Sequence, residues 1–158
     1  METIASLTSR FPAPGHIVWI GLRPARKEPL IPVERATITL TGLEGDHRNK
    51  PGKRTVTLIQ AEHLPVIAAL SQTKDATIAP ERLRRNIVVR KIPLIALRKR
   101  EFLIGTARLR GTDLCAPCSR METELGEGGY NAMRGHGGIC AEVLEDGVIE
   151  IDSDVVAV

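Results

Sequence analysis

The sequence predicts a mainly β fold, a closed or strongly bent and mostly antiparallel barrel with a few short helices. Three observations predict it. Short runs rich in β-branched residues recur along the chain, each run is bounded by Gly, Pro, Asp or Asn, and helical periodicity is rare. The chain has 158 residues, of which 42% are hydrophobic. This is enough apolar material for one core, so we expect a single domain over residues 1–158.

Eight short runs predict strands. Each is rich in Ile, Val, Leu or Thr and is bounded by residues that favour turns. The predicted strands are Ile4–Leu7, Ile17–Leu22, Ala36–Leu40, Thr55–Ile59, Ile87–Val89, Ala107–Leu109, Ile139–Leu144 and Val148–Ile151. Between the last two runs, Asp146-Gly147 predicts a hairpin with a type I′ turn, because that turn requires positive φ at both central residues.

Helices are predicted at three places. Gln60–Leu70 carries apolar residues at roughly helical spacing, and Pro65 lies near its start, where proline is tolerated. Pro80 is suited to the first position of a short helical turn. Ser119–Leu125 predicts a further turn that ends at Gly126.

Composition and charge exclude several function classes. The net charge of +3, from 22 Lys and Arg against 19 Asp and Glu, is a weak field for binding nucleic acid. Aromatic residues make up only 3%, too few for a module that stacks bases. No apolar run approaches the roughly 20 residues of a membrane helix. We therefore expect neither a nucleic-acid nor a membrane partner.

The compartment is predicted from the N-terminus and the cysteines. The first residues lack the basic flank and apolar stretch of a signal peptide. Three cysteines are an odd number in a chain too large to need disulfides, which favours reduced thiols. We expect a cytoplasmic protein.

Basic residues cluster in two stretches of the chain. One stretch runs from Arg82 to Lys91, and the other is Arg98-Lys99-Arg100. Most such clusters are solvated faces. The alternative is a pocket that binds an anion.

The segment Cys115-Ala116-Pro117-Cys118 is the most specific motif, and it has several interpretations. A thioredoxin-like dithiol should follow a strand and open a helix in a βαβ unit, which a barrel does not provide. A zinc site needs two more ligands. His136 and Cys140 are available, but the gap between Cys118 and His136 exceeds the usual spacing of a zinc finger.

A third interpretation is one reactive thiolate at Cys118. Pro117 stiffens the loop and presents Cys118 in a defined direction, and Arg120 is a nearby cation that favours thiolate over thiol. A thiolate attacks sulfur and binds soft metals. Against it stands the commonest fate of a cytosolic cysteine, which is to be buried and inert.

Three other segments combine cations with turn residues. Gly126–Gly138 is rich in glycine and contains Arg134 and His136, so it is either an anion-binding backbone or a surface loop. Gly42–Arg48 includes an adjacent Asp-His pair, which by itself is weak support for acid–base catalysis. Leu83–Ile87 places two arginines and an asparagine at the start of a strand, a combination suited to phosphate or carboxylate.

Taken in chain order, these segments resemble a stand-alone MOSC domain, the domain named for the C-terminal part of molybdenum cofactor sulfurase. The resemblance covers roughly Gly15–Val156. One departure is Asp152-Ser153-Asp154, where the family typically has a Gly-Asp turn, so this turn is expected to differ in shape. The segments that carry the resemblance are Gly42–Asp46, Val56–Gln60, Leu83–Val89, Cys115–Cys118, the glycine-rich loop and Gly137-Gly138-Ile139.

The resemblance implies a barrel of MOSC type with one essential cysteine, which falls on Cys118. In this family the cysteine is thought to carry sulfur as a persulfide or to bind the molybdenum of a pterin cofactor. By this resemblance Cys118 is the predicted catalytic residue and metal ligand, Cys115 supports its loop, and Cys140 has no role. The predicted residues for the cofactor's phosphate and pterin are Arg48, Arg85, Asn86, Arg134 and His136.

Two activities follow from the resemblance. Members that bind molybdenum cofactor resemble reductases of small N-hydroxylated substrates, and a chain of this length would need a separate electron donor. A sulfur carrier would instead take sulfur from a cysteine desulfurase. The alternative from another class is a non-catalytic barrel that binds an anionic ligand, with Cys118 structural or part of a zinc site.

Overall fold

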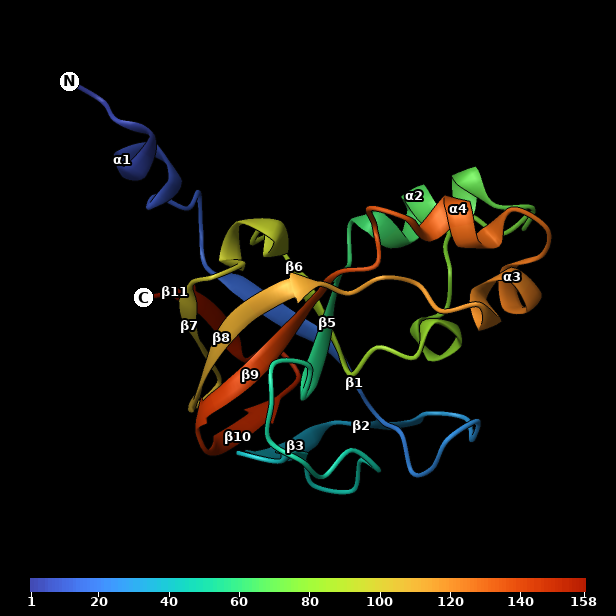
Figure 1. The fold of residues 1–158 in the computed structure, drawn as a ribbon, viewed down its shortest axis with the longest axis horizontal. Helices are drawn as coiled ribbons and strands as arrows, with labels where there is room; N and C mark the ends of the chain where they lie inside the picture. Colours follow the sequence, from blue (N-terminus) through green and yellow to red (C-terminus); the bar gives the residue numbers. More distant parts are fainter.

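The computed structural model describes residues 1–158 and is built around a closed barrel (Figure 1). Seven strands follow one another around it in the order β11-β7-β8-β9-β5-β6-β1, and β1 pairs with β11 to close the ring. All neighbours are antiparallel except β5 and β6. The strands are β1 (Gly15–Leu22), β5 (Val56–Gln60), β6 (Ile87–Arg90), β7 (Glu101–Ile104), β8 (Ala107–Leu114), β9 (Ile139–Glu145) and β11 (Asp154–Ala157). The predicted mainly β barrel is confirmed.

A smaller sheet lies at one end of the barrel. It joins β3 (Arg35–Thr39), β4 (Gly42–Leu43) and β10 (Gly147–Glu150), and it occupies the lower part of Figure 1. A further strand, β2 (Ile31–Val33), pairs with β1 beside the barrel.

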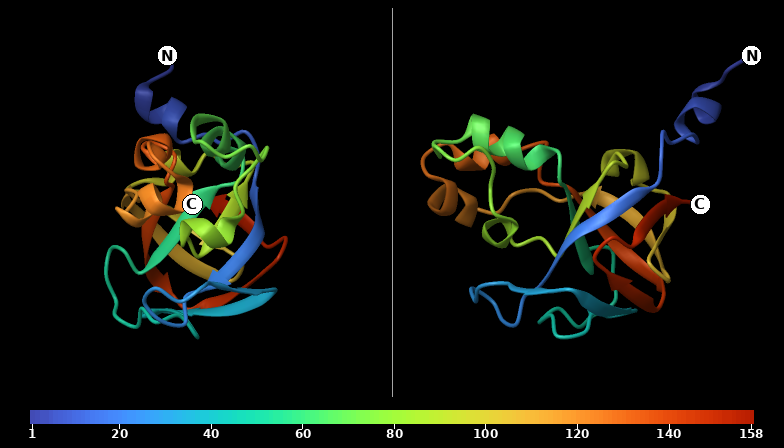
Figure 2. Two further views of the ribbon diagram at one scale, coloured as in Figure 1. Left: turned by 90° about the vertical axis from the view of Figure 1, so that its right-hand side faces the viewer. Right: turned by 180° about the vertical axis from the view of Figure 1, so that it is seen from behind.

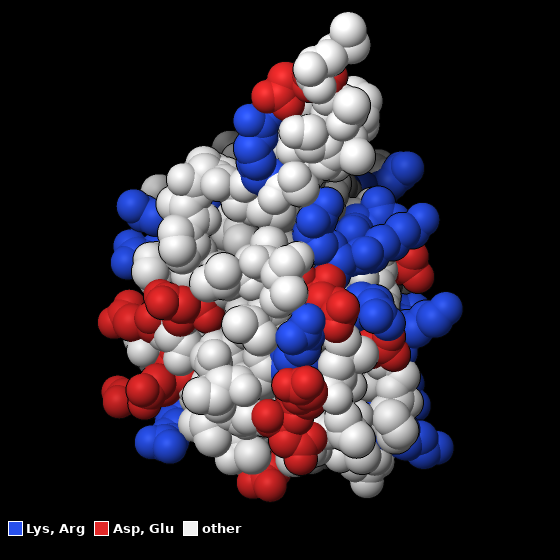
Figure 3. All heavy atoms as spheres, turned by 90° about the vertical axis from the view of Figure 1, so that its left-hand side faces the viewer, with Lys and Arg blue, Asp and Glu red and all other residues white.

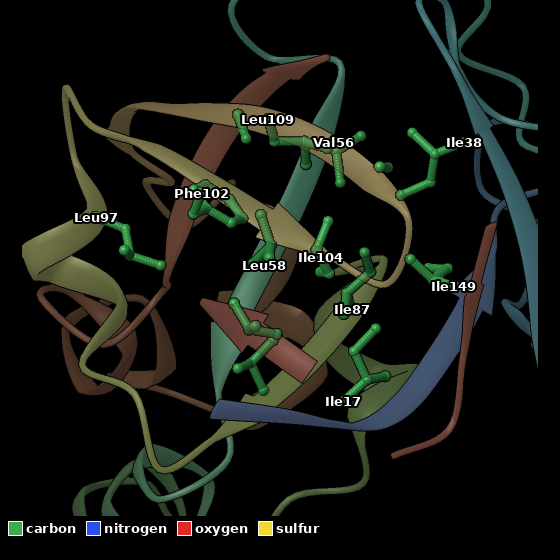
Figure 4. Close-up of a cluster of buried hydrophobic side chains, with 14 of the residues drawn as sticks. Ile17, Ile38, Val56, Leu58, Ile87, Leu97, Phe102, Ile104, Leu109 and Ile149 are labelled. Carbon is green, nitrogen blue, oxygen red and sulfur yellow. The ribbon is translucent and has the colours of Figure 1, made fainter. Parts of the chain in front are cut away.

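The barrel interior is an aliphatic core. Twenty-one buried residues form one cluster there, with Phe102 as the only aromatic member. Side chains from several strands converge on the barrel axis in Figure 4. Because successive residues of a strand point to opposite faces, short runs of Ile, Val and Leu are sufficient to fill this interior.

The opposite end of the barrel carries most of the helices. The parallel crossover from β5 to β6 runs through α2 (His63–Leu70) and a 3-10 helix, Pro80–Leu83. These pack with α3 (Arg120–Leu125) and α4 (Gly129–Met133) in a layer that Figures 1 and 2 show to one side of the barrel. A second cluster of 10 buried residues lies beneath this layer. The helices predicted around Pro65, Pro80 and Met121 are confirmed, and α4 inside the glycine-rich loop is a new element.

The N-terminal strand prediction is wrong. Residues Ile4–Thr8 form a short helix, α1, in which the Thr3 hydroxyl accepts a hydrogen bond from the backbone N–H of Ser6. The helix stands away from the barrel in Figures 1 and 2. Because β1 and β11 close the barrel, no free edge remains for a strand at this position.

The predicted hairpin at Asp146-Gly147 is also wrong. β9 pairs with β5 and β8, whereas β10 pairs with β3 in the other sheet. Neither Asp146 nor Gly147 has positive φ. A Cβ on Gly147 would lie 2.3 Å from the Ala107 nitrogen. Glycine is therefore needed here for close packing, and the dipeptide joins two sheets.

Two other features were missing from the prediction. Strands β2, β4, β7 and β11 were not expected, and neither was the 3-10 helix Leu94–Leu97. The turn before β11 has its left-handed residue at Asp152, with φ of 70°, so Ser153 does not need the freedom of glycine.

The second basic stretch, Arg98-Lys99-Arg100, lies on a solvated face of the barrel. Figure 3 shows Lys and Arg side chains gathered beside the N-terminal arm. Arg98, Lys99 and Arg100 line an open hollow under this arm, and Arg100 lies over the ring of Phe11. None of the helices is both long and apolar enough to span a membrane.

Candidate functional site

The cysteine motif forms the connection between β8 and α3. Cys118 is exposed, whereas Cys115 and Pro117 are buried, and all three cysteines of the chain are free thiols. The Met121 backbone N–H donates to the Cys118 carbonyl at 3.0 Å, at the point where α3 begins. The loop thus presents one thiol to solvent while its preceding residues are anchored.

Arg85 is the anchor of this loop. Its guanidinium is buried and donates to the carbonyls of Cys115 at 3.1 Å and Ala116 at 3.3 Å. It also donates to the carbonyls of Gly137 at 2.8 Å and Leu83 at 3.1 Å. One side chain therefore joins three separate segments of the chain. The structure uses Arg85 to position the loop, and its role toward a cofactor stays a prediction.

Asn86 is likewise committed to internal hydrogen bonds. Its amide oxygen accepts from the backbone N–H of Thr57 at 3.3 Å and from the Thr57 hydroxyl at 3.2 Å. Its amide nitrogen donates to the Gly21 carbonyl at 3.2 Å and to Asp46 at 3.3 Å. Asn86 thus ties β1, β5 and β6 together below the loop, and direct contact with a cofactor stays a prediction.

Asp46 and Arg23 form a buried ion pair next to Asn86. The Asp46 carboxylate is only 1% exposed and accepts from Arg23 through the backbone N–H at 2.7 Å, Nε at 3.2 Å and a terminal nitrogen at 2.9 Å. A buried carboxylate needs such partners because it has lost its hydration. Sequence reasoning missed Arg23, since no local motif marks it.

Arg84 has two other arginines, Arg120 and Arg23, and Cys118 within electrostatic range. Burial lowers the pKa of Arg84, and the nearby charges of Arg120 and Arg23 lower it further, against the opposing effect of Cys118 and Asp46. Arg84 has a left-handed backbone, with φ of 58°. It donates to the backbone carbonyls of the loop after β1, including that of Glu28 at 2.6 Å. Crowded guanidinium groups repel one another, and an anion would relieve that repulsion.

A hollow of about 480 Å³ lies beside these arginines. Among its cations, Arg82 is paired with Glu124 at 2.8 Å, whereas Arg84 and Arg120 have no carboxylate partner. Cys118 is not part of the lining, but Arg84 and Arg120 connect it to the hollow. The lining consists of Lys27, Glu28, Pro29, Glu81, Arg82, Arg84, Arg120, Met121, Thr123 and Glu124. Of the basic stretch from Arg82 to Lys91, only Arg82 and Arg84 line this hollow, so an anion-binding role for the stretch stays a prediction.

The other three predicted residues lie elsewhere around the loop. Arg134 is exposed and donates to Asn131 at 3.2 Å. His136 packs edge to face against His63, with ring centroids 5.0 Å apart, and its Nδ1 is buried without a partner. Arg48 lies in the loop after β4, and its Nε is also buried and unpartnered. Contacts between these residues and a cofactor stay predictions.

The cysteines do not form the predicted zinc or dithiol arrangements. No three His, Cys, Asp or Glu side chains are placed to hold a metal ion. The thiol nearest to Cys115 is that of Cys140, whereas Cys118 is exposed. That Cys140 has no role in the site stays a prediction.

Comparison with known proteins identifies the family. The sequence model of the MOSC domain matches residues 38–156, which is most of the chain. The chain belongs to the MOSC domain family. A comparison with curated proteins found no match.

Solved structures share the MOSC fold of this protein. The YuaD protein from Bacillus subtilis has a TM-score of 0.78 at 16% identity, with 90% of this chain and 94% of that chain covered. YiiM from Escherichia coli has a TM-score of 0.71 at 19% identity, with 93% and 70% covered. YiiM from Geobacillus stearothermophilus has a TM-score of 0.73 at 17% identity, with 92% and 75% covered.

Proposed function

We propose that this MOSC protein binds molybdenum cofactor through Cys118 and reduces small N-hydroxylated compounds, with electrons from a separate donor. One observation carries the proposal: Cys118 is exposed and within electrostatic range of Arg84, and Arg84 and Arg120 have no carboxylate partner. A soft thiolate is a suitable ligand for a metal such as molybdenum, and guanidinium groups suit a phosphate.

The donor set of the site fits the cofactor. Cys118 would hold the metal, and Arg84 and Arg120 at the hollow would hold the phosphate. Asp46 pairs with Arg23 and neutralises its charge, so Arg84 and Arg120 remain the arginines of the site without a carboxylate partner. When bound, the cofactor would supply a two-electron centre that accepts oxygen from the substrate.

The remaining residues of the site would act by positioning. Arg85 holds the carbonyls of Cys115 and Ala116, so the Cys118 thiol is presented in one direction before any ligand arrives. Asn86 and Asp46 keep the strand ends beneath the loop in register. Arg48, Arg134 and His136 are proposed to contact the pterin edges. Such pre-organisation lowers the cost of binding because little has to be ordered on association.

The test measures metal content and turnover. The protein is purified from a host that makes the cofactor, molybdenum per chain is determined by elemental analysis, and reduction of an N-hydroxylated amidine is assayed with a chemical electron donor. Cys118→Ser should abolish both bound metal and turnover, and Arg84→Gln should lower metal content. Ser119→Ala and Arg100→Gln are the matched controls and should retain both.

The outcomes separate the proposal from a simple binding barrel. Molybdenum content that is unchanged in Cys118→Ser would remove the role of Cys118 as ligand. Absence of turnover, together with unchanged binding of inorganic phosphate in Cys118→Ser, would favour the non-catalytic anion-binding barrel.

A second candidate function is sulfur transfer, which the exposure of Cys118 favours because it requires only an accessible thiolate. Cys118 would attack the outer sulfur of a persulfide on a cysteine desulfurase, the donor thiol would leave, and Cys118 would carry the sulfur to an acceptor. Mass spectrometry after incubation with a persulfide donor tests this. The expected result is one added sulfur on Cys118. Absence of the adduct in a protein that is active as a reductase would exclude the carrier.

A further inference from the structure

Two buried thiols lie together where β8 leads into the cysteine loop. Cys115 is 5% exposed and Cys140 is 1% exposed, and the two thiols are close enough for each to shift the pKa of the other. The backbone N–H of Cys115 donates to the carbonyl of Gly138 at 2.8 Å, next to the pairing of Leu114 with Ile139. Cys115 is thus diagonal to Cys140 on the same face of neighbouring antiparallel strands.

We propose that Cys115 and Cys140 are a redox-modifiable pair that forms a reversible disulfide when the protein meets a peroxide. The proposal rests on the contact between the two thiols, and it does not depend on a bound cofactor. A disulfide requires two sulfur atoms that can approach each other, and the register places Cys115 and Cys140 on the same face of paired strands, so no exchange of strand partners is needed.

An oxidant can reach one member of the pair. Cys115 lines a hollow of about 180 Å³, together with Pro117, Tyr130 and Arg134. Cys140 does not line it. A molecule as small as hydrogen peroxide therefore meets Cys115 first, and Cys140 is placed behind it as the second thiol.

The pKa shifts of the two thiols also indicate that Cys115 reacts before Cys140. The hydrogen bond from Cys140 lowers the pKa of Cys115 to about 6, against the opposing effect of burial and with help from the positive charges of Arg85 and Arg54. The same hydrogen bond and burial raise the pKa of Cys140. Because the thiolate is the nucleophile, Cys115 reacts with the oxidant and Cys140 resolves the product.

The chemistry balances with peroxide as the only oxidant. The Cys115 thiolate attacks one peroxide oxygen, the O–O bond breaks, and hydroxide leaves a sulfenic acid on Cys115. The sulfur of Cys140 then attacks that of Cys115, an S–S bond replaces the S–O bond, and water leaves. Overall, two thiols lose two electrons and two protons, and one peroxide becomes two waters.

The bond would tether the start of the cysteine loop to β9. Arg85 already holds the carbonyl of Cys115, so the tether would add a covalent link at the same point. It would also remove the negative charge of Cys115 from beside Arg85, Arg54 and Arg23. Cys118 lies outside the pair and would keep its free thiol.

The test maps the disulfide in metal-free protein carrying Cys118→Ser, which removes the exposed thiol. The protein is treated with hydrogen peroxide, quenched, alkylated under denaturing conditions and digested. We expect a cross-linked peptide pair joining Cys115 to Cys140, no alkylation at either residue, and full alkylation of both after dithiothreitol. Persistence of two alkylatable thiols after peroxide treatment would overturn the proposal.

Two further measurements keep the result specific. In Cys140→Ala, peroxide should leave a sulfenic acid on Cys115 that dimedone traps, with no internal cross-link. In the wild-type protein, which has three free cysteines, the cross-linked peptides should again join Cys115 to Cys140, with Cys118 outside the bond. A Cys115–Cys118 disulfide instead would overturn the proposal in favour of a Cys-x-x-Cys dithiol. The wild-type and Cys118→Ser maps decide the matter even if Cys140→Ala does not fold.

Discussion

The barrel interior and the cysteine loop are held in place in different ways. Twenty-one buried apolar side chains share the work of stabilising the interior. The loop depends on a few buried polar groups, above all Arg85, each of which makes several hydrogen bonds. Apolar contact is non-directional, so it fills space without aiming a residue, whereas hydrogen bonds fix where a thiol points. The position of the Cys118 thiol therefore depends on a few hydrogen bonds, whereas many apolar contacts share the stabilisation of the barrel interior.

The largest effect on stability is expected in the barrel interior. Phe102→Ala should lower the free energy of unfolding by about 3–5 kcal/mol, because it removes a fully buried ring and leaves a cavity. Leu103→Ala, on the same strand but 41% exposed, is the control and should change it by less than about 0.5 kcal/mol. Denaturant titration measures both. Equal losses would contradict the assignment of the core.

Substitution of Arg85 should lower the free energy of unfolding by less than Phe102→Ala does, but it should change the reactivity of Cys118. Arg85→Met should cost about 2–3 kcal/mol, because buried carbonyls of the loop lose their donor. Alkylation of Cys118 should become faster as the loop loosens. Arg90→Met, at an exposed strand end, should change neither quantity. If Cys118 in Arg85→Met reacts at the wild-type rate, Arg85 does not position the loop.

Alanine substitutions at two glycines near the site can distinguish the cost of a steric clash from the cost of a left-handed backbone. Gly138→Ala should cost about 2 kcal/mol, because its backbone is left-handed and the added Cβ would also strike the backbone of Leu58 and Ile59. Gly128→Ala has similar φ but open space around it, so we expect about 1 kcal/mol. Thermal denaturation of the two variants measures the difference in stability. Equal losses would mean that the short distance from Gly138 to the backbone of Leu58 and Ile59 does not matter.

A pH dependence of stability is expected from the buried thiols. The pKa of Cys115 is lowered from 9.0 to about 6 in the folded protein. Between these values the unfolded chain binds more protons, so stability should rise with pH from about 6 to 9 and fall as pH drops through 6. Cys140→Ala should flatten this slope, since it removes the hydrogen bond. Cys118→Ser should leave the slope unchanged in denaturant titrations at several pH values.

Local patterns predicted the family-bearing segments well. The ordered motifs from Gly42 to Ile139 indicated a MOSC domain, and the motif-bearing strands β5, β6 and β9 lie in the barrel. Predictions failed where the outcome depended on distant partners. Ile4–Thr8 has strand-forming residues but no free sheet edge, and Asp146-Gly147 lies between strands that pair with other strands.

By itself, the sequence determined the fold class and the MOSC family. These follow from local features: the period of the apolar residues, the turn residues and the order of the motifs. Tertiary structure alone decided that Arg23 joins Asp46 and Asn86, that Arg85 anchors the loop, and that Cys115 meets Cys140. The physical reason is barrel closure, which brings together residues that are 23 to 63 positions apart in the chain. A small aliphatic domain with three cysteines thus holds one thiol at its surface and two together in its interior.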